Sequence, residues 1–272
     1  MDDRAEYACA PGLGGLRLFR ADIVRYSFKR HSHDYYVVGI IERGVQRFSC
    51  GRRGYLTPPR GLVVINPGEA HTGESALPSG FRYRAFYPES SAMEAIAREL
   101  GASPAGMPAF PEPVIEDDEL YARFLALDEA LARGAPFLEQ ESCYLHALAG
   151  LVSRHTEARS APRRVPRESR AIVRARALIE ARYGEDLRLA DLAGAAGLSP
   201  FYFLRAFRAA TGLPPHAFLA SVRVREAQRL LRAGRPLAEV AFETGFSSQS
   251  HFSSVFKGLI GVSPGSYARA IS

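Results

Sequence analysis

The last hundred residues contain two similar units, and this internal repeat restricts the fold more than any other feature of the chain. LADLAGAAG (189–197) resembles LAEVAFETG (237–245) at an offset of 48 residues. The match continues through a pair of phenylalanines and a later Gly and Pro at an offset of 49, so the second unit has one extra residue. Such repeats indicate a duplicated architecture.

Each unit is predicted to be a short helix, a turn with glycine and a second helix. Gly197 and Gly245 can adopt the left-handed conformation that a tight turn needs. Ser199 and Ser247 stand at N-cap positions, and Pro200 suits the first helical residue. This is the layout of a helix-turn-helix. Many helical hairpins share it, but two copies in one module favour the helix-turn-helix interpretation.

The second helix of each unit has one face without carboxylates. In GFSSQSHFSSVFKGLIGVSP, Phe252, Phe256 and Leu259 recur at helical spacing and are expected to face the core, with serines and one lysine opposite. A helix that enters the DNA major groove needs short or planar side chains and no carboxylates beside the phosphates. The alternative is that the serines merely cover a solvent-exposed helix. The residues predicted to contact DNA are Phe201, Leu204, Arg205 and Arg208 in the first unit and Gln249, Ser250, Ser253, Ser254 and Lys257 in the second.

These residues are expected to divide their roles. Arg205 can bind guanine through two hydrogen bonds, and an apolar side chain beside it can touch a thymine methyl. Arg208 and Lys257 suit phosphates. A linking helix over 215–232 would be about 27 Å long, which allows the two units to reach successive major grooves about 34 Å apart on a bent duplex. It also carries four arginines that either contact the DNA backbone or are ordinary surface residues.

Charge is concentrated in the same part of the chain. Residues 167–272 hold fifteen Lys and Arg and eight Asp and Glu, whereas the rest of the 272 residues is almost balanced. A basic module joined to a neutral one indicates a polyanion-binding part combined with a second function.

Residues 16–88 are predicted to form strands. Short runs rich in Val, Ile, Tyr and Phe are separated by Gly or Pro, with no helical pattern between them, which favours an antiparallel sandwich or barrel. Helices are then predicted over 90–101, 116–134 and 137–155. The segment 158–169 has prolines and arginines but little to bury, so it is predicted to be a linker. The strand candidates are LRLF, IVRYSF, YYVVGIIE, VQRFSC, LVVINP and FRYRAFYP.

The C-terminal part resembles the AraC/XylS family of bacterial transcription regulators. LADLAGAAGLSPFYFLRAFRAATGLPPHAFL and LAEVAFETGFSSQSHFSSVFKGLIGVSPGSY carry the resemblance. HSHDYYVVGIIERG and GLVVINPGEAHTG resemble the family's cupin-type sensor domain more loosely. The resemblance implies an all-β, cupin-like barrel with following helices over 1–157, a linker over 158–169, and a seven-helix domain with two helix-turn-helix motifs over 170–272. Its helices would begin near Arg170, Leu189, Pro200, Pro215, Leu237, Ser248 and Pro264.

The resemblance also implies a function. It suggests a cytoplasmic regulator, often an activator, that binds double-stranded promoter DNA and responds to a small-molecule effector in the barrel. The family often has basic residues at the positions of Ser254 and Gly258. The second motif of this chain is therefore expected to bind DNA more weakly or less selectively than the first. A homodimer and contact with RNA polymerase are further expectations, while activation versus repression stays open. The stripe Leu138, Leu145, Leu148 and Val152 would suit either a dimer interface or packing against the barrel.

The N-terminal histidines raise the question of a metal site. His31 and His33 would share one face of a strand, and His71 follows the Pro67–Gly68 turn. Metal-binding cupins place a Glu three or four residues after the second His, where this chain has Tyr36 and two valines. We therefore expect no metal and no cofactor. A mixture of Arg, His and Tyr suits a small polar molecule such as a sugar or an aromatic acid. The expected ligand-binding residues are His31, His33, Tyr36, Arg47, His71, Arg82 and Tyr83.

Motifs of catalysis and membrane insertion are missing from the sequence. It has no nucleophile elbow, Walker loop, dinucleotide fingerprint or zinc motif, so we expect no enzyme. Cys9, Cys50 and Cys143 lack metal or disulfide spacing. No run of 18 apolar residues and no signal-peptide pattern occurs, so no membrane association is expected. Two alternatives remain: a cupin metalloenzyme with a basic helical tail, and an architectural protein that binds nucleic acid without sequence preference.

Overall fold

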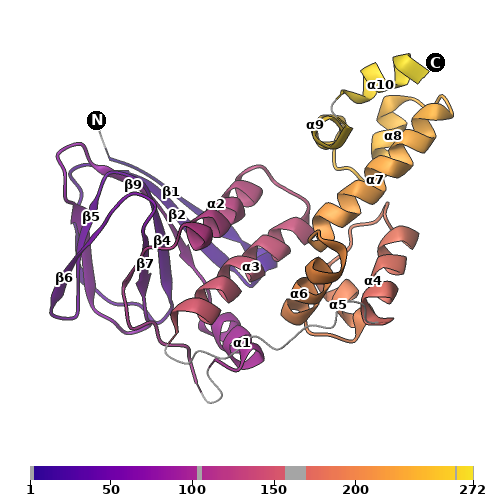
Figure 1. Ribbon diagram of the computed structural model, residues 1–272. Coiled ribbons are helices and arrows are strands. Elements are labelled where there is room, and N and C mark those ends of the chain that lie inside the picture. Colours follow the sequence, from indigo (N-terminus) through magenta and orange to yellow (C-terminus); the bar gives the residue numbers. More distant parts are fainter. Residues whose placement is uncertain (1–2, 103–105, 157–169, 261, 272) are drawn as a thin grey trace. The chain divides into compact units, whose positions relative to one another are not determined.

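The computed structural model describes residues 3–102, 106–156, 170–260 and 262–271. The chain forms two compact units, one of Met1–Arg133 with Cys143–Arg163 and one of Gly134–Ser142 with Arg164–Ser272. The strands lie in the first unit and most helices in the second (Figure 1). The predicted linker, 158–169, lies outside the described residues. None of the described helices is long and apolar enough to cross a membrane.

Two antiparallel sheets build the first unit, as the strand pattern predicts. The six-stranded sheet has the order β1-β2-β9-β4-β7-β10. The four-stranded sheet has the order β3-β8-β5-β6. The strands are β1 Arg4–Ala10, β2 Leu16–Ile23, β3 Phe28–His31, β4 Val37–Arg43, β5 Gln46–Cys50, β6 Arg53–Thr57, β7 Leu62–Ile65, β8 His71–Ser75, β9 Phe81–Tyr87 and β10 Val114–Ile115, with a 3-10 turn at Pro11–Leu13.

The strand prediction is wrong in one place and incomplete in several others. IVRYSF is not one strand, because residues 24–27 form the bend where the chain passes from β2 in one sheet to β3 in the other. The prediction also missed β1, β6, β8, the two-residue β10 and all of β3 except Phe28. The strands β1, β6 and β8 are polar or rich in exposed residues, so they lack the apolar run on which the prediction depended.

The core of the first unit lies between its two sheets. Phe81, Tyr83 and Ala85 of β9 alternate into this core. Phe48 and Cys50 of β5 enter it from the other sheet. The two intervening arginines of β9 therefore lie on the opposite face of the six-stranded sheet.

Three helices follow or interrupt the strands: α1 Ser90–Leu100, α2 Asp118–Ala132 and α3 Phe137–His155. Of the predicted leucine stripe on α3, Leu138, Leu148 and Val152 are fully buried, and Leu145 is half-buried. This burial favours packing within the chain over the dimer interface that the sequence left open.

The described residues of the second unit form seven further helices, and the seven predicted starts agree with the structure to within one residue. Pro stands in the first turn of α6 and α7, where its missing N–H costs no hydrogen bond. One predicted cap is wrong: the Ser248 hydroxyl, not that of Ser247, accepts the His251 N–H. The helices are α4 Arg170–Ala181, α5 Leu189–Ala196, α6 Pro200–Thr211, α7 Pro215–Arg232, α8 Leu237–Glu243, α9 Gln249–Ile260 and α10 Pro264–Ile271.

Candidate nucleic-acid interface and sensor site

The first repeat forms a helix-turn-helix from α5 and α6. Gly197 ends α5 with φ +67°, the left-handed conformation predicted for the turn. The Arg174 guanidinium on α4 donates to the carbonyls of Ala195 and Ala196 at 2.9 and 3.0 Å. These bonds satisfy carbonyls that have no partner within α5 and hold the turn against α4.

The second repeat forms a helix-turn-helix from α8 and α9. Gly245 has φ +77°, and a Cβ there would lie 2.7 Å from the Gly184 carbonyl oxygen, so only glycine fits this turn. Beside it, Arg223 of α7 is buried and donates to the carbonyls of Tyr183 and Glu185, each at 2.8 Å. Burial lowers the pKa of Arg223 to about 10. Arg223 therefore holds the domain together and does not face solvent.

The inward face of α9 agrees with the prediction except at one position. Phe252 and Phe256 are fully buried and pack with residues of α7 and α8. Leu259, predicted to join them, is 51% exposed, and Ile260 packs against the core instead. The apolar stripe of α9 thus drifts by one residue in the last turn.

Two residues predicted to contact DNA from α6 are buried. Phe201 and Leu204 are 7% and 8% exposed. Helix α6 contacts α4, α5 and α7, so its apolar face is wider than the Phe203–Phe207 stripe used in the prediction. Arg205 is half-buried with its guanidinium 5.7 Å from the Phe201 ring, and Arg208 is exposed. The solvent-facing side of α6 runs through Tyr202, Arg205 and Arg208.

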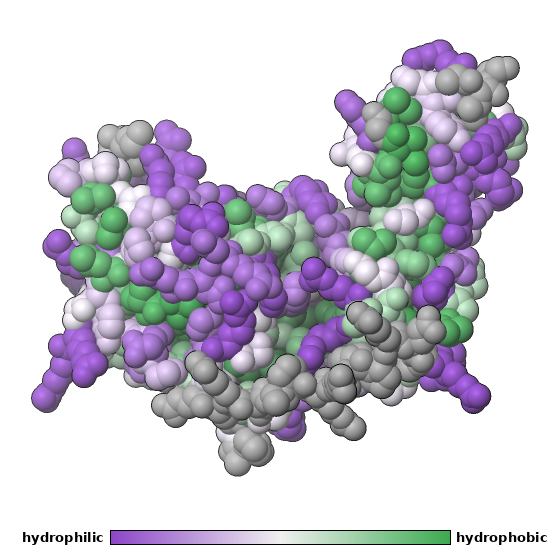
Figure 2. Space-filling model, viewed as in Figure 1, coloured by the Kyte–Doolittle hydropathy of each residue, from purple (hydrophilic) through white to green (hydrophobic). Residues whose placement is uncertain are grey.

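The predicted face of α9 is open to solvent. Gln249, Ser250, Ser254 and Lys257 are exposed and Ser253 is half-buried. Neither α6 nor α9 contains a carboxylate. Around α9, Figure 2 shows hydrophobic residues (green) at the surface of this unit among hydrophilic ones (purple). The exposed large apolar side chains of the unit are Val173, Leu213, Phe242, Leu259 and Val262.

The basic residues of this unit differ in whether a carboxylate lies beside them. Four surface arginines away from these two helices are held by carboxylates: Arg182 by Glu185, Arg225 and Arg229 by Glu226, and Arg235 by Glu239 and Glu243. By contrast, within the described part of the chain no carboxylate lies at ion-pair distance from Arg205, Arg208 or Lys257. Their charge is therefore available to an external anion.

In the first unit, His31, His33 and His71 come together as the sequence predicted. Their ring centroids lie 4.5 to 5.0 Å apart. His31 ends β3 and is paired with His71 of β8. His33 lies beyond the end of the strand, so the two histidines do not share a strand face as the prediction assumed. The Tyr35 ring stacks on the His33 ring at 4.6 Å, and the Arg17 guanidinium lies 4.0 Å from the centre of the Tyr35 ring.

The environment of this group keeps two of its imidazoles neutral. Burial, together with the charges that His71, His31 and Arg17 would place beside it, lowers the pKa of His33 to about 4. Burial also lowers the pKa of His71, partly offset by a hydrogen bond to the Glu69 carbonyl. At neutral pH both rings can therefore present a free lone pair.

Tyr36 and Arg47 do not join the histidines. Tyr36 is fully buried, and its hydroxyl donates to the Pro108 carbonyl at 2.7 Å. Arg47 is exposed and pairs with Glu74 across the strands. Their predicted place in a single ligand site is not supported by these positions.

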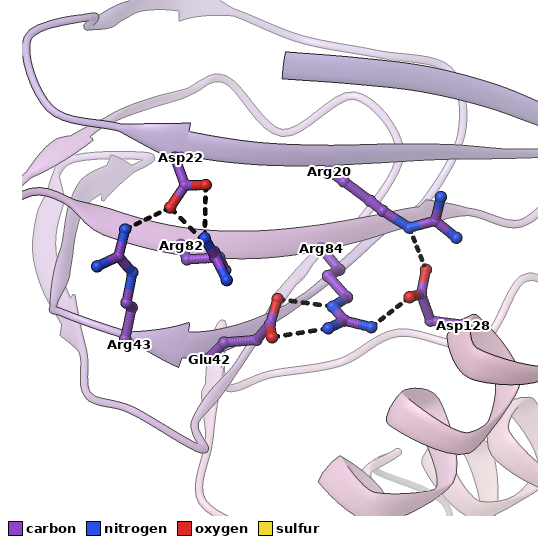
Figure 3. Close-up of polar contacts among 7 residues, drawn as sticks. All are labelled: Arg20, Asp22, Glu42, Arg43, Arg82, Arg84 and Asp128. Carbon is purple, nitrogen blue, oxygen red and sulfur yellow. Dashed lines mark hydrogen bonds and ion pairs between the residues drawn. The ribbon is translucent and has the colours of Figure 1, made fainter. Parts of the chain in front are cut away.

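Arg82 belongs to a charged network on the outer face of the six-stranded sheet (Figure 3). Asp22 accepts two hydrogen bonds from Arg82, each 2.9 Å, and one from Arg43 at 2.6 Å. Buried Asp128 of α2 accepts from Arg20 at 2.8 Å and from Arg84. Tyr83 points the other way, into the core.

This network lines a cleft of about 450 Å³ between β1, β2, β9 and α2. Glu42 completes it with two bonds from Arg84, at 2.6 and 2.7 Å. Carboxylates neutralise these guanidinium groups, and the bonds of Arg20 and Arg84 to Asp128 fasten α2 to the sheet. Of its residues only Arg82 was predicted to belong to a site, and alternating Arg and Asp or Glu on neighbouring strands is the signal that could have revealed the others.

Comparison with known proteins agrees with both halves of the structure. Residues 13–149 match the AraC-like ligand binding domain, and residues 192–270 match a helix-turn-helix domain. An uncharacterised HTH-type transcriptional regulator of Bacillus subtilis, YbfI, is 30% identical over 236 residues, which cover 87% of this chain and 85% of that protein.

Other proteins match a smaller share of the chain. The Msm operon regulatory protein of Streptococcus mutans is 34% identical over 35% of this chain and 34% of its own length. Among solved structures, the C-terminal domain of AraT, a response regulator from Geobacillus stearothermophilus, is 33% identical over 39% of this chain and 88% of that chain, with a TM-score of 0.37. The chain therefore belongs to the AraC family of HTH-type transcriptional regulators, with an AraC-like ligand binding domain followed by a helix-turn-helix DNA-binding domain.

Proposed function

We propose that this regulator reads promoter DNA with α6 and α9, each in a major groove of the same duplex. The observation that carries the proposal is the distribution of charge. Arg205, Arg208 and Lys257 have no carboxylate partner among the described residues, and they lie on helices that contain no Asp or Glu. The serines of α9 can donate to or accept from base edges.

The contacts are divided between bases and backbone. Arg205 is proposed to bind guanine through two hydrogen bonds, while Gln249, Ser250, Ser253 and Ser254 face the bases of the second half-site. Arg208 and Lys257 are proposed to contact phosphates. A small polar effector binds in the first unit and has a higher affinity for one conformation of the protein than for another. Binding therefore changes the population of the conformation that binds DNA.

The remaining features of the proposal concern how the protein works in the cell. It acts in the cytoplasm as a homodimer on double-stranded DNA, with RNA polymerase as a further partner, and it catalyses no reaction. The family membership of the chain supports this part of the proposal, as do its lack of a catalytic sequence motif and the two DNA-reading helices.

Selection of sheared genomic DNA by the purified full-length protein, at about 0.15 M salt to suppress non-specific binding, tests the proposal. We expect a few fragments to be enriched that share a bipartite site with half-sites about one helical turn apart. Capture of all fragments alike, with strong salt dependence, would instead support a non-specific architectural protein.

A pair of charge-matched variants locates the reading surface. Ser254→Glu places a carboxylate on the open face of α9, where it would lie against the DNA, and should abolish the enrichment. Ala177→Glu adds the same charge at an exposed position of α4 and should leave it intact. Equal losses in both variants would contradict the assignment of α9.

A further inference from the structure

The histidine group of the first unit has the composition of a metal site. One ring nitrogen from each of His31, His33 and His71 lies within 4.8 Å of those of the other two. No carboxylate or thiol of the described residues belongs to the group. His71 is buried and the other two are half-buried, so the nitrogens are partly withdrawn from water.

Two of the rings are held in the orientation that a metal ligand needs. The Nδ1 atoms of His31 and His71 lie 2.6 Å from the Lys29 carbonyl oxygen and 2.9 Å from the Glu69 carbonyl oxygen. A carbonyl has no hydrogen to donate, so each Nδ1 carries the proton and each neutral ring keeps its Nε2 lone pair free. Metal-ligating histidines are oriented in this way by backbone carbonyls.

The third ring is positioned by stacking. His33 lies against Tyr35 at 4.6 Å with the ring planes 10° apart, and the Arg17 guanidinium lies 4.0 Å from the centre of the Tyr35 ring. Since His33 follows the end of β3, strand pairing does not fix its side chain. Zinc bonds of about 2.0–2.1 Å would require nitrogens about 3.4 Å apart, so the longest separation has to shorten by about 1.4 Å, within the reach of side-chain rotation.

We propose that His31, His33 and His71 bind one divalent transition-metal ion, with Zn²⁺ as the ion that three imidazoles and one further ligand fit. Neutral nitrogen donors suit Zn²⁺ and its first-row neighbours, whereas Mg²⁺ and Ca²⁺ require oxygen ligands that this group lacks. Three protein ligands leave one coordination position for water or for an oxygen or nitrogen atom of an effector. This inference reverses the sequence-based expectation that the chain binds no metal.

The test uses the full-length protein with its affinity tag removed and its metals stripped by a chelator. Isothermal titration with Zn²⁺ should give one ion per chain. Co²⁺, added in place of Zn²⁺, should develop the visible absorption of a tetrahedral site. His33→Asn should weaken Zn²⁺ binding by more than about 100-fold, since removing a ligand costs more than removing an outer partner. His71→Asn should do the same.

Matched variants keep the proposal falsifiable. His146→Asn, on α3 and outside the group, should bind Zn²⁺ as the parent does. His71 is buried, so His71→Asn can lose structure, and the half-buried His33 is therefore the decisive position. The far-ultraviolet circular dichroism spectrum of His33→Asn is compared with that of the parent to check its fold. Zn²⁺ binding that survives His33→Asn, that disappears with Cys50→Ser instead, or that falls well below one ion per chain would overturn the three-histidine assignment. None of these measurements involves DNA, so their outcome is separate from that of the proposed function.

Discussion

The Nε–H of Arg223 donates to the main-chain carbonyl of Tyr183 at 2.8 Å, joining α7 to the segment that precedes α5. The same guanidinium donates to the Glu185 carbonyl and lies 5.8 Å from the Phe246 ring. One buried arginine therefore connects the segment before the first helix-turn-helix motif with the turn of the second.

Replacing Arg223 should destabilise the second unit. Arg223→Ala leaves two carbonyls without their donor and opens a cavity, so we expect the free energy of unfolding to fall by about 2–4 kcal/mol. Urea unfolding of the full-length protein, followed by circular dichroism, measures the change. Arg225→Ala removes an exposed arginine two positions away and should cost less than about 1 kcal/mol. Similar losses in the two variants would contradict the structural role of Arg223.

Asp128 should be a stabilising residue of the first unit. It is 1% exposed and accepts hydrogen bonds from Arg20 and Arg84. Asp128→Asn removes the charge that both guanidinium groups face, but Arg84 keeps Glu42, so we expect a loss of about 1–3 kcal/mol in unfolding free energy. Near-ultraviolet circular dichroism follows mainly this unit, because nine of the twelve tyrosines lie in it. The exposed pair Arg60–Asp118 provides the control, and Asp118→Asn should change stability by less than about 1 kcal/mol.

Asp117 makes the stability of α2 depend on pH. Burial alone would raise its pKa, but hydrogen bonds from His155 and the Leu120 N–H outweigh burial, so the pKa of Asp117 is lowered from 3.8. A carboxyl with a depressed folded-state pKa stabilises the protein above its unfolded pKa, and the contribution is lost as the pH falls through the folded value. The unfolding free energy of the parent should exceed that of Asp117→Ala by about 1–2 kcal/mol at pH 6. This difference should shrink below about pH 4, and a difference independent of pH from 6 to 3 would contradict the assignment.

Arg205 should contribute more to the preference for one DNA sequence over another than to the affinity for DNA in general. Arg205→Ala is expected to weaken binding to the selected site by about 1–3 kcal/mol and to relax preference at one base position. Fluorescence anisotropy with the selected duplex and a scrambled one measures both effects. Equal losses on the two duplexes would argue against base reading by this side chain.

Lys257 should act on the phosphate backbone. Lys257→Ala is expected to weaken binding to specific and scrambled DNA alike and to reduce the slope of log K against log salt by about 1. Arg229→Ala is the control, because Arg229 is already paired with Glu226 at 3.0 Å and should leave the slope nearly unchanged. A selective loss on specific DNA would assign Lys257 to a base instead.

The helical half of the chain was predictable because its signals are local. Pro at helix starts, Gly in the turns and the spacing of Phe203, Phe207, Phe252 and Phe256 depend on neighbouring residues along the chain, and the seven helix starts implied by the family resemblance agree with the structure to within one residue. The antiparallel sheets were also predictable as a class. The strands β1, β6 and β8 were not, because their pairing partners rather than their own apolar content make them strands.

The sequence by itself determined the two-part organisation, the repeated helix-turn-helix and the carboxylate-free faces of α6 and α9, since composition and helical spacing set these features locally. Only the tertiary structure decided which side chains on those faces reach solvent. Phe201 and Leu204 are covered because α4, α5 and α7 all pack on α6, a fact of three-dimensional neighbours. Tertiary structure likewise separated Tyr36, Arg47 and Arg82 from the histidines, and joined His71 to His31 across a strand pair forty residues apart in sequence. Burial and approach between distant segments are properties of the folded chain, and spacing along the sequence does not contain them.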